Sequence, residues 1–141
     1  MNYEHFSKID ENLWMGGTPA EWESGIPEHI QFIVNLYPWG QYDLYQHQVM
    51  TVTPMYDSEV IPDRALLELL ADHVNACRKH GDVLVHCQQG WNRSGLVTAL
   101  AMIRGGMEAS TAIHTIRTKR NHMCLSNRAF HDWLVRYEVT A

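Results

Sequence analysis

The stretch "GDVLVHCQQGWNRSGLVTALAMIRGG" (81–106) decides the fold. Its first part, "DVLVH" (82–86), is short, apolar and β-branched, which is typical of a central strand in a parallel sheet. Its last part, "SGLVTALAMIRGG" (94–106), is apolar on nearly every side and predicts a helix buried in the middle of the domain. The loop between them carries a lone cysteine, a glycine and an arginine, which a solvated structural loop does not need.

The rest of the chain supplies further strands before this stretch and helices on both sides of it. We expect strands at 9–17, 29–38 and 50–57, and helices at 62–81, 108–120 and 126–138. Strands come early and helices late, with a helix between strands, so the class is α/β. We predict a central, mostly parallel sheet flanked by helices, and a single domain over 1–141 because no repeat or linker occurs.

Composition and charge exclude several classes of protein. The net charge of −5 argues against a general nucleic-acid surface or anionic-membrane surface, which is normally basic. The first residues do not resemble a signal peptide, and no stretch is apolar enough to insert into a membrane. If the substrate is an anion, a local group of positive charges must bind it, because the protein as a whole is negatively charged.

The three cysteines, Cys77, Cys87 and Cys124, are odd in number and widely spaced, which is typical of reduced thiols. We therefore expect a cytoplasmic protein. Nine histidines raise the question of zinc, but the sequence holds no CxxC or HxxxH pair, and "HMC" (122–124) is a weak candidate. We expect no metal and no other cofactor.

The loop after the 82–86 strand has the features of a phosphate cradle. A helix that starts near Ser94 offers free backbone amides and a partial positive charge at its N-terminus. Gly90 and Gly95 allow successive amides to turn inward, and the planar guanidinium of Arg93 matches two phosphate oxygens. Cys87 lies at the base of this cradle, where the same positive field stabilises a thiolate. Such a thiolate is a nucleophile aimed at phosphorus.

The loop "HCQQGWNRSG" (86–95) resembles the HCxxGxxR[ST]G signature of cysteine-dependent protein phosphatases, and the whole chain is similar to their small dual-specificity branch. The segments "IDENLWMGG", "IRTKR" and "SNRAFHDWL" are similar to the opening strand and closing helices of that branch. The resemblance implies that Cys87 is the nucleophile, Arg93 the phosphate clamp, and Ser94 the hydroxyl that stabilises the thiolate when water cleaves the phospho-enzyme. It implies phosphate binding by the amides of Gln88, Gln89, Gly90, Trp91 and Asn92.

The family also uses an aspartic acid as general acid, on a loop upstream of the cysteine. Asp57, in "PMYDSEV", lies at the distance that the resemblance implies, although an Asp here also suits a turn. Asp63 is the competitor, but it sits at a predicted helix start, where an Asp usually serves the helix dipole. We favour Asp57. His86 is expected to be a hydrogen-bonded core histidine, and the resemblance implies that Asn127 ties the closing helix to the phosphate loop.

These features predict a protein phosphatase that hydrolyses phosphotyrosine, with phosphoserine and phosphothreonine, through a cysteinyl-phosphate. Its expected partner is a phosphorylated protein. Nucleic acid is not favoured, yet "GWNRSG" is similar to the loop of RNA 5′-triphosphatases, and "GW" to that of phosphoinositide-cleaving myotubularins. Both substrates stay alternatives on the same fold. An inactive phosphate-binding module is disfavoured, because Cys87, Arg93 and Asp57 are all present.

Overall fold

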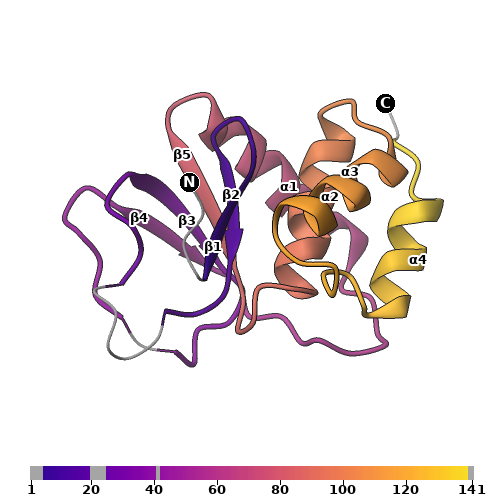
Figure 1. Ribbon diagram of the computed structural model, residues 1–141, viewed down its shortest axis with the longest axis horizontal. Coiled ribbons are helices and arrows are strands. Elements are labelled where there is room, and N and C mark those ends of the chain that lie inside the picture. Colours follow the sequence, from indigo (N-terminus) through magenta and orange to yellow (C-terminus); the bar gives the residue numbers. More distant parts are fainter. Residues whose placement is uncertain (1–4, 20–24, 41, 140–141) are drawn as a thin grey trace.

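The computed structural model describes residues 5–19, 25–40 and 42–139. A five-stranded sheet forms one side of the molecule and four helices form the other (Figure 1). The strands are β1 (Phe6–Asp10), β2 (Leu13–Gly16), β3 (Ile30–Asn35), β4 (Val49–Val52) and β5 (Asp82–His86). The helices are α1 (Arg64–Arg78), α2 (Arg93–Arg104), α3 (Ala109–Lys119) and α4 (Arg128–Arg136).

The strand β5 lies at the centre of the sheet, whose order is β1-β2-β5-β3-β4. It runs parallel to both neighbours, β2 and β3, and β4 is parallel to β3, whereas β1 is antiparallel to β2. The predicted α/β class with a mostly parallel sheet is confirmed, and so is the central parallel position of 82–86. In such sheets, ligands bind beyond the carboxyl ends of the central strands, which here is the end of β5.

The expectation of one strand over 9–17 is wrong, because the chain reverses there. β1 and β2 form an antiparallel pair, and the tight turn between them passes through Asn12, whose φ is +56°. Asparagine tolerates this left-handed conformation better than most residues. The strand expected over 50–57 is also shorter than predicted. β4 ends at Val52, and Pro54, which has no N–H to donate, lies in the segment that leads on to Asp57.

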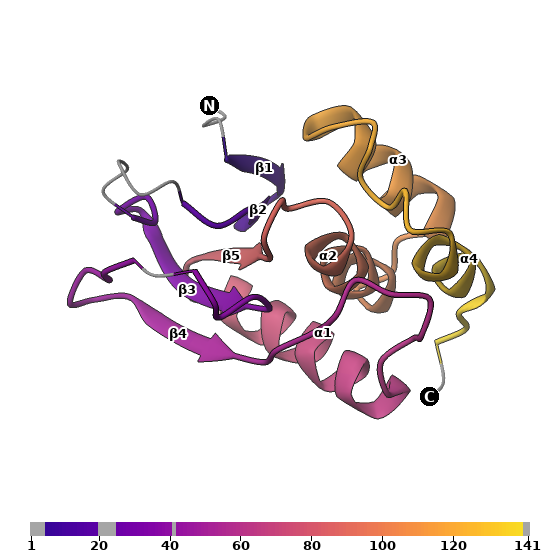
Figure 2. The ribbon, with the colours of Figure 1, turned by 90° about the horizontal axis from the view of Figure 1, so that it is seen from below.

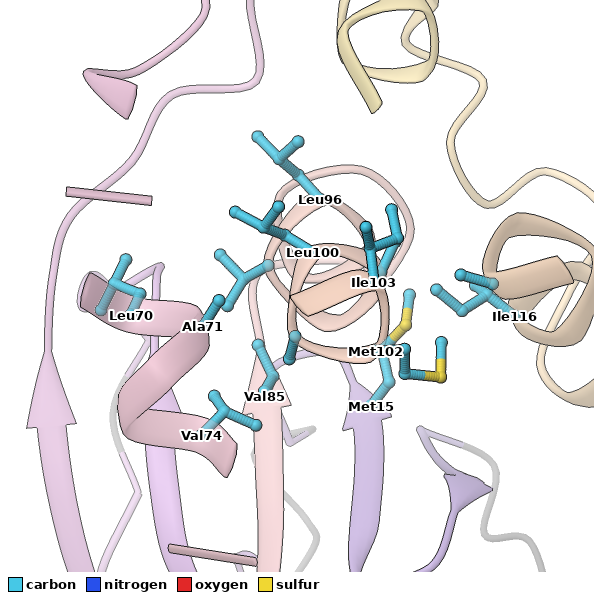
Figure 3. Close-up of a cluster of buried hydrophobic side chains, with 14 of the residues drawn as sticks. Met15, Leu70, Ala71, Val74, Val85, Leu96, Leu100, Met102, Ile103 and Ile116 are labelled. Atoms are coloured by element: carbon cyan, nitrogen blue, oxygen red, sulfur yellow. The ribbon is translucent and has the colours of Figure 1, made fainter. Parts of the chain in front are cut away.

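The four helices lie on one face of the sheet: α1, α2 and α3 contact it, and α4 packs outside α2 (Figure 2). Figure 3 shows the apolar side chains that fill the space between α1, α2 and the strands β2 and β5. A second, smaller cluster covers the other face of the sheet and includes Trp14, Ile26, Ile33 and Leu84. Alternate residues of β5 therefore reach both clusters, because side chains alternate across a strand.

The helix α2 is the most deeply buried of the described helices, as its sequence predicted. Every residue from Ser94 to Ile103 is buried. Because α2 is fixed by packing along nearly its whole length, its N-terminus and the loop that precedes it are held rigidly beyond the end of β5. No helix in the described parts of the chain is both long and apolar enough to cross a membrane.

Candidate active site

The loop between β5 and α2 is bound tightly to the end of β2. The backbone N–H of Cys87 donates to the Gly16 carbonyl at 3.2 Å. Gly90 has a φ of +77°, and a Cβ built there would lie 2.3 Å from the Gly16 carbonyl carbon. Glycine is therefore required at position 90 for both its backbone conformation and its close approach to β2.

The carbonyl groups of this loop accept hydrogen bonds from groups outside it. Thr18 binds the first two: its Oγ1 donates to the Cys87 carbonyl at 3.1 Å, and its N–H donates to the Gln88 carbonyl at 2.9 Å. Further along, the Trp91 carbonyl accepts from the N–H of Leu125 at 3.1 Å. The carbonyls are thus directed outward, toward the surrounding chain.

Arg120, which follows α3, binds the two middle carbonyls. Its Nε donates to the Gly90 carbonyl at 2.7 Å and its Nη2 to the Gln89 carbonyl at 3.0 Å, while Nη1 reaches Ser7 Oγ at 3.1 Å. Burial lowers the pKa of the Arg120 guanidinium, which nevertheless stays cationic near neutral pH. Sequence reasoning missed this residue, because nothing in "IRTKR" distinguishes an arginine that binds a distant loop from a solvated one.

The backbone amides of this loop beyond Cys87 have no hydrogen-bond acceptor among the described residues. None of the backbone N–H groups of residues 88–93 donates a hydrogen bond to any other described residue. Because their carbonyls are bound outside, these amides face the interior of the loop, where they form a nest for an anion. The predicted phosphate-binding positions therefore have the required backbone geometry, although their role as phosphate ligands stays a prediction.

The N-terminus of α2 adds to this anion site. Asn92 occupies the N-cap position, yet its side chain makes no capping hydrogen bond to the helix. At the start of α4, by contrast, Asn127 Oδ1 accepts from the Phe130 N–H at 3.1 Å. The first amides and the positive end of the α2 dipole are thus available to a ligand.

Cys87 lies at the base of the nest with only 2% of its surface exposed. Its Sγ is 3.3 Å from the Oγ of Ser94, a fully buried residue in the first turn of α2. The contact places a hydroxyl next to the sulfur, as the proposed role of Ser94 requires. Above the sulfur opens a pocket of about 270 Å³, lined by Asp57, Cys87, Gln88, Gln89, Trp91, Asn92 and Arg93.

Arg93 crosses from the start of α2 to the segment after β4. Its Nη1 donates to the Met55 carbonyl at 3.2 Å, and its guanidinium carbon lies 5.2 Å from the centre of the Tyr37 ring. The Nε is buried and has no hydrogen-bond partner among the described residues. A buried donor without a partner is costly, so a ligand that accepts from this guanidinium would remove that cost; the role of Arg93 as phosphate clamp stays a prediction.

The structure separates the two candidates for the general acid. Asp57 lines the pocket, and its carboxylate accepts from Asn92 Nδ2 at 3.0 Å and from Asn127 Nδ2 at 2.7 Å. Asp63 is the N-cap of α1, where its Oδ2 accepts from the Leu66 N–H at 3.2 Å. Asp57 therefore lies at the pocket and Asp63 has the contact of a helix cap, while the role of Asp57 as the acid stays a prediction.

The N–H of Asn127 donates to Asn92 Oδ1 at 2.9 Å, so this residue does tie the start of α4 to the loop between β5 and α2. His86 supports the loop from the side of the sheet. The Cys87 carbonyl can only accept, so His86 Nδ1, at 3.2 Å, donates to it, and His86 Nε2 accepts from the Tyr42 hydroxyl at 2.6 Å. Burial lowers the pKa of His86 to about 4, which keeps the ring neutral at physiological pH.

Cys77 and Cys124 are buried, unpaired thiols in the main core. Burial raises the pKa of Cys124 to about 11, so this thiol stays protonated. No cluster of three or more His, Cys, Asp or Glu side chains suited to a metal ion occurs within residues 5–19, 25–40 and 42–139.

One comparison with known proteins shows the family of this chain. The sequence matches the family model for the catalytic domain of dual specificity phosphatases over residues 23–140. Among curated proteins, none matches the sequence significantly.

Among solved structures, human DUSP28 is 22% identical with a TM-score of 0.80, over 94% of each chain. The human tyrosine phosphatase-like serine/threonine/tyrosine-interacting protein is 18% identical with a TM-score of 0.77, over 94% of each chain. PTPMT1 in complex with PI(5)P is 16% identical with a TM-score of 0.69, over 92% of this chain and 96% of that one. At such identities the likeness shows a shared fold.

Proposed function

The chain belongs to the dual specificity phosphatase family, and from this premise we propose that it hydrolyses phosphotyrosine, and also phosphoserine and phosphothreonine, in protein substrates. The reaction proceeds through a cysteinyl-phosphate on Cys87. We also propose that it acts in the cytoplasm, which suits three free cysteines.

One observation carries this proposal: the loop of residues 87–93 has its carbonyls bound outside and its amides free around a buried thiol. A neutral ligand gains little from such a nest, whereas a phosphate dianion gains several charge-assisted hydrogen bonds. The guanidinium of Arg93 adds donors at the pocket wall. Negative charge that develops on the phosphoryl oxygens in the transition state is stabilised by hydrogen-bond donors that are already oriented. Such electrostatic stabilisation is usually the largest single contribution to catalysis.

The chemistry follows from the placement of three side chains. The Cys87 thiolate attacks phosphorus, an S–P bond forms, and the P–O bond to the leaving group breaks. Asp57 gives its proton to the departing oxygen. In the second step water attacks phosphorus and transfers a proton to the Asp57 carboxylate, while the S–P bond breaks. Ser94, whose Oγ is 3.3 Å from the sulfur, donates a hydrogen bond to the thiolate that leaves.

The size and charge of the site favour a substrate with a single phosphate. Of the described residues that line the pocket, Arg93 alone is cationic. Next to the pocket lies a shallow groove of about 690 Å³ that shares Asp57 and Asn92 with it. Its charged side chains are the carboxylates Asp57, Glu59 and Asp132 and the single guanidinium of Arg128, which pairs with Asp132 at 3.7 Å. A triphosphate or a polyphosphorylated inositol carries further phosphates, which these carboxylates would repel.

The experiment that tests the proposal compares substrates of different classes at equal concentration. The panel holds phosphotyrosine, phosphoserine and phosphothreonine peptides, a phosphoinositide, and 5′-triphosphorylated RNA, with the Cys87→Ser variant as the blank for each. The phosphopeptides should be hydrolysed with the highest kcat/KM. A higher kcat/KM for the phosphoinositide or for the RNA would replace the protein substrate, and no turnover of any substrate would favour a binding module.

A further inference from the structure

The side chain of Asn92 makes two hydrogen bonds, and neither goes to its own helix. Its Nδ2 donates to Asp57 Oδ2 at 3.0 Å, and its Oδ1 accepts from the Asn127 N–H at 2.9 Å. Asparagine at an N-cap normally accepts from the second or third amide of the helix. The Asn92 side chain instead points away from its helix and binds the Asp57 carboxylate across the pocket.

Asp57 needs such a contact, because no regular element fixes it. It is an exposed residue in the irregular segment between β4 and α1. Its two carboxylate oxygens are each held by one amide: Oδ2 by Asn92 and Oδ1 by Asn127. A carboxyl oxygen has two lone-pair positions, so one amide bond on each oxygen leaves room for the proton that the acid transfers.

We propose that Asn92 is a positioning residue for the general acid: its amide, together with that of Asn127, holds the Asp57 carboxyl at a fixed place relative to Cys87. Asn92 belongs to the same rigid loop as the nucleophile. Its hydrogen bond to Asp57 therefore fixes the position of the acid relative to the sulfur that attacks phosphorus. Small displacements of reacting groups are costly, since about 1 Å of misplacement can lower a rate by about a hundredfold. This inference rests on the proposed phosphatase function and deepens it.

The test uses Asn92→Leu, which has nearly the same shape and adds no charge beside the phosphate. Its side chain can neither donate to Asp57 nor accept from the Asn127 N–H. A series of aryl phosphates with leaving groups of increasing acidity serves as substrates, because only poor leaving groups need a proton. We expect kcat to fall roughly tenfold or more for a leaving group as basic as phenol, and to change less than about twofold for the most acidic one. Asn92→Ala should behave in the same way.

A double variant separates positioning from damage to the loop. In an Asp57→Asn background, Asn92→Ala should cause no further loss of kcat, because the acid it positions is already gone. Asn75→Ala is the matched control: this asparagine also bridges two elements, from α1 to the Ala101 carbonyl at 2.8 Å, but lies outside the residues that line the pocket. It should leave the dependence on the leaving group unchanged. Thermal unfolding verifies that each variant folds.

Two results would overturn the inference while the proposed function stands. One is an equal loss of kcat for all leaving groups in Asn92→Leu and Asn92→Ala. The other is a loss in the double variant that equals the product of the two single losses. If the unmodified protein hydrolyses no aryl phosphate at all, the proposed function itself fails, and the inference fails with it.

Discussion

The N-cap residues of α1 and α2, Asp63 and Asn92, are of similar type, but only Asp63 caps its own helix. At α1, Asp63 accepts from the Leu66 N–H and closes the helix end. At α2, Asn92 turns its side chain to Asp57 and Asn127, and the first amides stay open. Asp and Asn are about equally good N-caps, so the residue type does not explain the difference.

The difference lies in what surrounds each helix end. The start of α1 is exposed, and a cap contributes there to the stability of the helix. The start of α2 faces a buried thiol, and several neighbours, among them Thr18 and Arg120, bind the carbonyls of its loop. At α2 the N-cap side chain makes no hydrogen bond to the helix, and the carbonyls of the preceding loop are bound by other parts of the chain. The amides at this helix end are therefore available to a ligand. The predictions below test that contrast.

The largest effect is expected for Cys87→Ser. A hydroxyl stays neutral where a thiolate is ionised, so turnover should fall by a factor of roughly 10⁴ or more. The open end of α2 should remain, so inorganic phosphate should still bind, as measured by titration calorimetry. Appreciable turnover in this variant would mean that the nucleophile lies elsewhere.

The next effect concerns the guanidinium at the start of α2. Arg93→Lys should lower kcat/KM nearly as much as Arg93→Ala, by roughly 10²–10³, because lysine keeps the charge but cannot hold two phosphate oxygens in a plane. Steady-state kinetics on a phosphotyrosine peptide measures both variants. Near-normal kcat/KM for the lysine variant would show that charge alone suffices.

A third pair of variants compares the two aspartates directly. Asp57→Asn should lower kcat on a phosphotyrosine peptide by roughly a hundredfold and remove the alkaline limb of the pH–rate profile, because the acid that had to be protonated is gone. Asp63→Asn should do neither, since asparagine still caps α1. If Asp57→Asn proves harmless on this peptide, the acid has been misassigned.

The smallest effect belongs to the closed helix end. Asp63→Ala removes the cap of α1 and should lower the free energy of unfolding by about 1 kcal/mol, measured by urea denaturation, with kcat unchanged. A change in kcat without a change in stability would place Asp63, instead of Asp57, in the reaction.

Local patterns in the sequence predicted the elements that lie at the centre of the fold. The β-branched run of β5, the all-round apolar α2 and the loop between them could be recognised because each depends on residues that are neighbours in the chain. The hairpin of β1 and β2 was missed, because "IDENLWMGG" alternates as one strand would and the turn depends on a positive φ at Asn12. The early end of β4 was missed, although Pro54 in the expected strand is a residue that weakens strand pairing.

The candidate site shows the same limit more sharply. The signature located Cys87, Arg93 and Ser94, and the resemblance pointed to Asp57. The contacts that shape the site are long-range: Arg120 reaches Gly90 and Asn92 reaches Asp57 across distant parts of the chain. Only the fold brings these groups together. No local pattern announces that a side chain at a helix start will leave its own helix uncapped.

The central claim is that the open end of α2 holds a phosphate for attack by Cys87, and trapping the intermediate tests it most directly. Ser94→Ala should slow the release of the thiolate in the second step, so the phospho-enzyme should accumulate during turnover of an aryl phosphate. Acid quenching followed by mass spectrometry of the peptide that contains residue 87 should find a phosphoryl group on Cys87, and none in Cys87→Ser. A phosphoryl group on another residue, or steady turnover with no covalent phosphoryl group on the protein, would contradict the account.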